Sequence, residues 1–227
     1  MKLARKPGSD WMSYFVYRKE CWKTTWSFRL AFLLLIFGIA FLTRSYWSVK
    51  LGESLVCSEP PRRSVALLLE NFDPDYQLFE RARELMVSGA ARMLLVPIPL
   101  DNETKLPDPI AIGIMNVMVI NARLPSPTII PIPEIEPISL NAAQEIRSFL
   151  KKANIESVTV VSPGFRSRRS ELVYRKVLNP AGIAVGCVPV FGTSPVSWPR
   201  TWHGIEDFLE QFVKLAYYRL YVLPRFA

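Results

Sequence analysis

The sequence has little of what metal and disulfide chemistry requires. It contains one histidine, His203, and three cysteines, Cys21, Cys57 and Cys187, in 227 residues. Structural zinc sites use four His or Cys ligands at short spacings, so we expect no metal site. Two alternatives stay open for Cys57 and Cys187. They form a disulfide if their compartment is oxidising, or Cys187 is a small buried thiol within a strand.

Common catalytic and nucleic-acid-binding motifs are also missing. There is no G-x-S-x-G elbow, no P-loop and no G-x-G-x-x-G turn, so we expect no cofactor, with a nucleotide-type cofactor at the carboxyl edge of the sheet as the weaker alternative. No aromatic RNA-binding motif or Lys-rich tail points to a nucleic-acid partner. His203 begins the last predicted helix, where a local hydrogen bond is its expected role, with a functional role as the alternative. Without a complete set of nucleophile, base and orienting residue, the sequence favours a non-catalytic protein.

What the sequence does contain is a long uncharged apolar run, Leu30 to Thr43, preceded by Trp26 and followed by Tyr46 and Trp47. With these interfacial aromatics the run predicts one transmembrane signal-anchor helix over residues 28–47. A cleaved signal peptide is the less favoured alternative, because the preceding region is long and no small-residue cleavage site follows. The net charge is +8. Because most of it lies before the apolar run, we expect a cytoplasmic N-terminus.

The predicted span divides the chain into four parts. Residues 1–27 form a cytoplasmic, aromatic-rich arm of the interfacial amphipathic type, residues 28–47 the span, residues 48–63 a linker, and residues 64–227 an extracytoplasmic domain. The expected partners are the lipid bilayer and membrane proteins that contact the arm and the span.

The outer domain alternates short β-branched or aliphatic runs with amphipathic ones. We expect strands over residues 64–69, 91–96, 128–132, 157–161 and 183–190, with helices over 75–87, 110–124, 139–152, the stretch after 164, and 202–223. This order predicts an α/β fold, a doubly wound, mostly parallel five-stranded Rossmann-like sheet. The prolines around residues 128–132 favour an edge strand. Asp73 before Pro74 predicts the first helix N-cap of the domain. The apolar stretch 110–124 predicts a buried helix or a surface that packs on a partner.

The turn after the fourth strand is the candidate binding site. Ser162, Pro163 and Gly164 lead into a helix that opens with Arg166, Arg168 and Arg169. Helical spacing places Arg166 and Arg169 near the inner face and turns Arg168 away.

Positive charges at a helix N-terminus oppose the helix dipole, and a bound anion would compensate. We therefore predict an anion site made by Ser162, Gly164, Arg166 and Arg169. The alternative is a solvated basic face. Glu70 and Asn71, at the end of the first strand, and His203 are supporting candidates, because ligands of such sheets bind at the carboxyl ends of the strands.

The outer domain resembles the ElyC/SanA-type family of bacterial envelope proteins. The resemblance covers about Ser64 to Leu223 and rests on three stretches, FERARELMVSGAARMLLV, SPGFRSRRS and WHGIEDFLEQFVKLAYYRL. By this match Arg169 stands at the arginine of the family's Thr-Ser-x-x-His-x-x-Arg segment, whereas the histidine is Arg166 here. The family's glycine-rich turn after strand one is Glu70-Asn71-Phe72. The chain is thus similar to a divergent member with most of the polar signature replaced.

Two functions follow as expectations. The favoured one is an accessory or scaffold subunit of a larger membrane assembly, anchored in a bacterial inner membrane with its domain in the periplasm. The alternative, implied by the resemblance, is an envelope enzyme or binding protein that acts on a phosphorylated glycan or carrier lipid. In that alternative Arg166 and Arg169 clamp the phosphate and Glu70 serves as general base or cation ligand.

Overall fold

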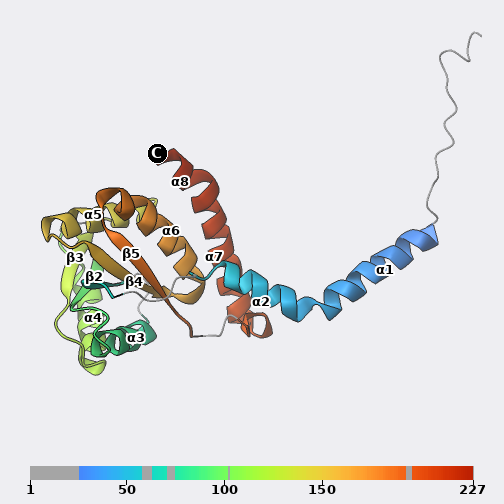
Figure 1. Ribbon diagram of the computed structural model, residues 1–227, viewed down its shortest axis with the longest axis horizontal. Coiled ribbons are helices and arrows are strands. Elements are labelled where there is room, and N and C mark those ends of the chain that lie inside the picture. Colours follow the sequence, from blue (N-terminus) through green and yellow to red (C-terminus); the bar gives the residue numbers. More distant parts are fainter. Residues whose placement is uncertain (1–25, 58–62, 71–74, 102, 193–195, 227) are drawn as a thin grey trace, which may run out of the picture. The chain divides into compact units, whose positions relative to one another are not determined.

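The computed structural model describes residues 26–57, 63–70, 75–101, 103–192 and 196–226. The chain divides into two compact units, Met1–Arg44 and Ser45–Ala227. The first unit contributes one described helix, α1 (Trp26–Leu42). The second is an α/β unit, and it holds all the strands (Figure 1).

The elements of the α/β unit alternate as the sequence predicts. After α2 (Arg44–Ser54) they are β1 (Ala66–Leu69), α3 (Tyr76–Val87), β2 (Met93–Pro99), α4 (Pro109–Asn121), β3 (Thr128–Ile132), α5 (Ile138–Lys152), β4 (Ser157–Pro163), η2 (Gly164–Arg166), α6 (Ser167–Leu178), η3 (Asn179–Ala181), β5 (Ala184–Val190), η4 (Trp198–Arg200), α7 (Trp202–Tyr217), η5 (Tyr218–Val222) and α8 (Leu223–Arg225). The strand order is β3-β2-β1-β4-β5, and every described pairing is parallel. This confirms the α/β fold and the parallel five-stranded Rossmann-like sheet, and it confirms β3 as an edge strand.

Two apolar cores cover the two faces of the sheet. In β1, Ala66 and Leu68 face one side and Leu67 and Leu69 the other, because successive side chains alternate. The first core receives α5, α6 and η5, and the second receives α3 and α4. The unit is therefore a three-layer sandwich (Figure 1). Because the strands are parallel, their carboxyl ends all lie at the same edge of the sheet, where ligands of such sheets bind.

β2 is longer than predicted and includes Pro97 and Pro99. The prediction ended the strand before these prolines because they cannot donate a ladder hydrogen bond. The registers explain why they are tolerated. β2 pairs with β1 only as far as Leu95 but with β3 from Leu95 to Pro99. Beyond Leu95, β2 therefore has no described strand partner on the β1 side, and a proline there loses no ladder hydrogen bond.

The predicted cap of α3 was wrong. The N-cap is Asp75, whose carboxylate accepts a hydrogen bond from the Gln77 N–H at 2.9 Å. Asp73 and Pro74 lie outside the described residues. The prediction chose the Asp-Pro pair because proline favours the first helical position, but Asp75 lies one residue before the helix and satisfies a free N–H of its first turn.

The apolar helix α4 is a surface helix and not the buried helix of the first predicted alternative, and its packing on a partner stays a prediction. Asp108 caps it, with Pro109 at its first position. Only Met115 and Val119 are buried, whereas Ile110 and Ile120 are more than 70% exposed. Its outer face is therefore an apolar surface of the α/β unit.

The end of α2 and the residues after it dock onto the α/β core. Leu55 is fully buried in a small core with Phe165, Trp198 and Phe208. Its carbonyl accepts the Arg168 N–H at 3.0 Å, and the Trp198 indole N–H donates to the Ser48 carbonyl at 2.9 Å. Residues 48–57, within the predicted linker, therefore belong to the domain.

A disulfide joins Cys57 to Cys187 in β5. The sequence left two alternatives, this disulfide or a buried Cys187 thiol, and the structure shows the disulfide. The Cys57 N–H also donates to the Ser167 hydroxyl at 3.0 Å. The disulfide thus fixes the chain that enters the domain beside the turn between β4 and α6.

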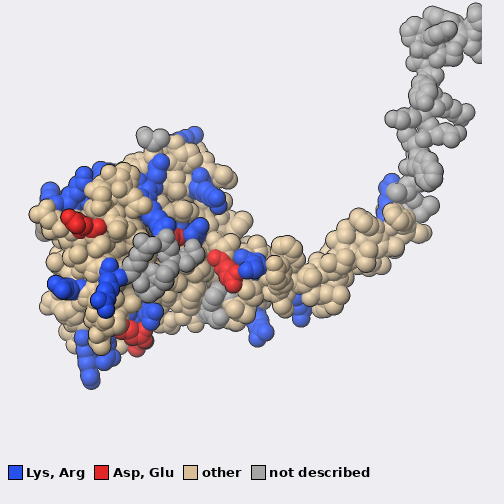
Figure 2. Space-filling model, viewed as in Figure 1, with Lys and Arg blue, Asp and Glu red and all other residues tan. Residues whose placement is uncertain are grey.

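The predicted membrane segment is split between two helices. α1 has 17 residues, and its only charged residue is Arg29. Most of its residues are apolar, and Figure 2 shows its surface without charged side chains over most of its length. Among the described residues no single helix is long and apolar enough to cross a bilayer, although α1 and α2, separated only by Thr43 and bent by 63°, together have a sufficient length and composition.

Alanine substitutions at two helical glycines should have opposite effects on the free energy of unfolding. A Cβ at Gly204, in the first turn of α7, would lie 2.4 Å from the Trp198 carbonyl oxygen, whereas one at Gly113 in α4 would meet nothing within 4 Å. Gly204→Ala should lower the free energy of unfolding by about 1–3 kcal/mol through this overpacking. Gly113→Ala should raise it by roughly 0.5–1 kcal/mol, the usual helix preference for alanine. Urea unfolding of both variants checks this. Equal effects of the same sign would contradict the close packing at Gly204.

Candidate anion-binding site

A buried carboxylate lies at the carboxyl end of β1. Glu70 has no exposed surface, and its Oε2 accepts hydrogen bonds from the hydroxyls of Ser162 and Ser170, both at 2.5 Å. The Nε of Arg166 lies 3.6 Å from the same oxygen. β1 and β4 are parallel neighbours, so the ends of both strands bring these groups together across 92 residues of sequence. Glu70 therefore holds the turn after β4 and orients Arg166.

Two arginines are buried beside this carboxylate. Arg166 is 9% exposed and Arg169 is 6% exposed. The Arg169 guanidinium lies over the ring of Tyr218, 5.4 Å from its centroid. Burial lowers the pKa of Arg169 and the nearby Arg166 cation lowers it further, whereas Glu70 and Tyr218 raise it. Arginine nonetheless stays charged in proteins, so two cations share one buried anion here.

These arginines line a cavity of about 390 Å³ at the carboxyl edge of the sheet. The other lining residues come from the ends of β2 and β3, the start of α5, and α7 with η5. They are Pro99, Glu134, Glu136, Ile138, Ser139, Lys214, Tyr217 and Tyr218. The volume is of the size that accommodates a small organic ligand.

Charge is distributed unevenly between the floor and the rim of this cavity. Arg166 and Arg169 are the buried charged side chains that line it, whereas Glu134, Glu136 and Lys214 are exposed. Lys214 also pairs with Glu210. The floor suits an anionic group, which guanidinium donors bind with charge-assisted hydrogen bonds. The rim carboxylates suit hydroxyl donors. A ligand that carries both, a phosphorylated sugar for example, matches this arrangement.

The structure separates the predicted site residues into two places. Gly164 and His203 line another cavity of about 260 Å³, together with Asp75, Phe191 and Asp207 among others. His203 points to solvent, 3.7 Å from Glu206. Burial raises the pKa of Asp207, and Glu210 adds to the rise. Gly164 does not line the cavity of Arg166 and Arg169. The structure therefore gives its backbone N–H no role in that cavity.

Ser162 and Glu70 lie beneath the arginines rather than in the cavity. The Ser162 hydroxyl has one proton, and it goes to Glu70. Ser162 is fully buried. Both residues are therefore positioning residues for Arg166, which differs from the expectation that Ser162 contacts the anion. Asn71 lies outside the described residues.

Sequence reasoning missed several residues of the site. Ser170 follows Arg166 by one helical turn, so the i, i+4 spacing was a signal for it. Tyr174 is one turn further on and is buried, with no hydrogen-bond partner for its hydroxyl among the described residues. Burial raises the pKa of that hydroxyl well above its usual value, and Glu70 adds to the rise. Tyr218 lies in η5, far along the chain from Arg166, and no local sequence pattern indicates that it contributes to the site.

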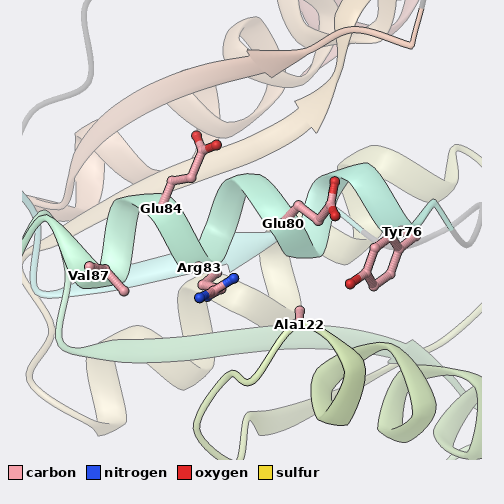
Figure 3. Close-up of a pocket in the computed structure, with 6 residues that line it drawn as sticks. All are labelled: Tyr76, Glu80, Arg83, Glu84, Val87 and Ala122. Carbon is pink, nitrogen blue, oxygen red and sulfur yellow. The ribbon is translucent and has the colours of Figure 1, made fainter.

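A third hollow lies on the outer surface of α3, and it has a different character. Tyr76, Glu80, Arg83, Glu84 and Val87 line it along α3, with Ala122 beyond α4 opposite them (Figure 3). The α3 side chains are all exposed. Glu84 pairs with Arg81 on the same helix. Because no buried charge faces this groove, it is a weaker candidate than the arginine cavity.

The geometry defines a class of protein, a doubly wound parallel α/β domain with a cationic cavity at the carboxyl edge of its sheet. Comparisons with family models, with curated proteins and with solved structures found no match to this chain. In the part of the chain that the structure describes, no three His, Cys, Asp or Glu side chains are grouped to hold a metal ion.

Proposed function

We propose that this chain is a membrane-anchored binding protein for a phosphorylated glycan or carrier lipid. The observation that carries the proposal is the pair of buried guanidinium groups, Arg166 and Arg169, on the floor of one cavity with rim carboxylates above them. The phosphate binds Arg166 and Arg169. Sugar hydroxyls donate to Glu134 and Glu136.

The resemblance to the ElyC/SanA-type envelope family agrees with this ligand class. The role of Glu70 in the proposal is to hold Arg166 and not to act as a base, since Glu70 has no exposed surface and does not line the cavity, and its Oε2 faces two serine hydroxyls and the Arg166 guanidinium. The proposed protein binds its ligand without transforming it.

The proposed location is a bacterial inner membrane, with residues 1–27 in the cytoplasm and the α/β unit in the periplasm. The apolar helix α1 and the aromatic residues near its ends support the anchor. The disulfide between Cys57 and Cys187 supports an oxidising compartment for the domain. Protease protection in sealed vesicles tests the orientation.

Arg169→Gln should weaken phosphate binding. Loss of a hydrogen bond to a charged group costs roughly 1.5–3 kcal/mol, so we expect the Kd for glucose 1-phosphate to rise roughly 10- to 100-fold. Isothermal titration measures it, with the exposed Lys152→Gln at the end of α5 as the charge-matched control. An unchanged Kd in Arg169→Gln would remove the proposed clamp.

A second pair of variants separates the rim from the floor. Glu134→Gln and Glu136→Gln should weaken binding of glucose 1-phosphate but not of inorganic phosphate, which has no sugar hydroxyls. If both ligands are affected equally, the rim carboxylates act through the general field of the cavity and not through hydroxyl contacts.

An accessory or scaffold subunit of a membrane assembly is the second candidate. The exposed apolar face of α4, with Ile110, Val117 and Ile120 among its residues, favours it. Mild detergent extraction that yields a monomer without bound protein would count against this candidate and would leave the ligand site untouched.

A further inference from the structure

We propose that the outer face of α7 lies on the lipid surface of the membrane in which the chain is anchored. This inference rests on the proposed anchor. It adds a second, peripheral membrane contact that holds the α/β unit against the bilayer.

The first observation is that α7 and its continuation η5 carry large apolar residues both toward the core and on the exposed side. Phe208 of α7, with Tyr218 and Val222 of η5, is buried toward the cores. On the other side the helical spacing aligns an exposed set of large apolar residues, Trp202 at 73%, Leu209 at 54%, Phe212 at 46%, Val213 at 64% and Leu220 at 78% exposure. A helix on the surface of a soluble domain is normally polar on its outer face. Such a stripe marks an interaction surface.

The second observation is the length of chain between the predicted membrane segment and α7. α2 follows α1 after a single residue, Thr43. Ser48 is four residues beyond Arg44, about 6 Å along a helix. The Ser48 carbonyl accepts the Trp198 indole N–H. Four residues after Trp198, α7 begins at Trp202.

This distance compares directly with the thickness of the membrane interface. The polar headgroup layer on each side of a bilayer is roughly 5–8 Å deep. If α1 inserts up to Arg44, the contact between Ser48 and Trp198 falls within this layer. The start of α7 is then held at the membrane surface by a hydrogen bond, the small core around Leu55 and the Cys57–Cys187 disulfide.

The residues around the stripe fit the interface between water and lipid. Trp202, Tyr217 and Tyr221 are exposed, and aromatic residues of this type concentrate at the headgroup level. Arg225 lies over the Tyr221 ring, 3.5 Å from its centroid. Glu206 lies within the stripe, between Trp202 and Leu209, and Glu210 lies beside it. We therefore infer contact of apolar side chains with the headgroup and acyl boundary, not attraction to anionic headgroups.

Spin labels on the full chain test the inference. In a Cys21→Ser background, with the Cys57–Cys187 disulfide oxidised, single cysteines are introduced by Val213→Cys on α7, Leu220→Cys on η5, Ile36→Cys in α1, and Glu80→Cys on α3 as the control. The labelled protein is reconstituted into vesicles of phosphatidylethanolamine and phosphatidylglycerol. Collision with oxygen, which concentrates in lipid, is compared with collision with a water-soluble nickel chelate.

We expect the oxygen-to-nickel ratio at 213 and 220 to exceed that at 80 several-fold, and the ratio at 36 to be the highest. A lipid-like ratio at 36 with water-like ratios at 213 and 220 would overturn the inference and leave the anchor standing. A water-like ratio at 36 would show that the anchor itself fails, and the inference with it. Labels at 213 and 220 that are shielded from both reagents would mean that a protein covers α7, which also overturns the inference.

Discussion

Glu70→Ala should be among the most destabilising single substitutions in this protein, with a loss of about 3–5 kcal/mol in the free energy of unfolding. Glu70 has no exposed surface and is the carboxylate that faces Arg166 at 3.6 Å. Its removal takes away the carboxylate that accepts the Ser162 and Ser170 hydroxyls, and among the described contacts Ser162 keeps only its 3.2 Å contact with the Ser170 oxygen. It also removes the buried carboxylate beside two buried guanidinium groups, whose like charges then repel each other with less compensation.

Chemical denaturation of the detergent-solubilised chain measures this loss. Glu80→Ala, which removes a carboxylate from the exposed outer surface of α3, should change the free energy of unfolding by less than about 0.5 kcal/mol. A double-mutant cycle with Arg166→Met adds a test. The double variant should be less destabilised than the sum of the two single variants, because removal of one cation lowers the cost of losing the anion. Additivity would contradict the ion pair.

Reduction of the Cys57–Cys187 disulfide should have an effect of similar size. The two cysteines are 130 residues apart. In the loop-closure model a cross-link of that span stabilises by about 5 kcal/mol, within a usual range of about 2–5 kcal/mol for native disulfides. In addition, the bridge joins the chain just after α2 to β5, an edge strand of the sheet, so its loss frees the small core around Leu55.

Thermal unfolding with and without a thiol reductant measures the contribution of the disulfide. The control is the Cys57→Ala/Cys187→Ala variant, which should unfold at the lower temperature and show no further response to reductant. A Tm that does not change on reduction of the wild-type protein would mean that the bridge is absent in solution, and it would remove one support for an oxidising compartment.

The secondary structure was largely predictable, because hydrophobic periodicity reports burial along a single element. The alternation of strands and helices, the edge position of β3 and the inward direction of Arg166 and Arg169 all follow from local pattern. The limits appear where one element depends on another. Pro97 fits within β2 only because β1 ends earlier on that side.

The site was predictable in part for the same reason. The rule that ligands bind at the carboxyl ends of parallel strands placed Glu70 and the arginines together. The rule does not say that Ser162 points to Glu70 and away from the cavity, or that Gly164 belongs to a separate hollow. The contributions of Tyr218 and Lys214 depend on how the last helix crosses the edge of the sheet, and no short-range signal encodes that crossing.

The central claim is that the cavity above Arg166 and Arg169 binds a phosphate-like anion. The most direct test is a crystal of the full chain soaked with tungstate, an electron-dense oxyanion whose position is located by anomalous scattering. The proposed site predicts a tungsten peak inside the cavity, with oxygens within hydrogen-bonding distance of both guanidinium groups. An occupied site elsewhere on the protein with this cavity empty would contradict the claim.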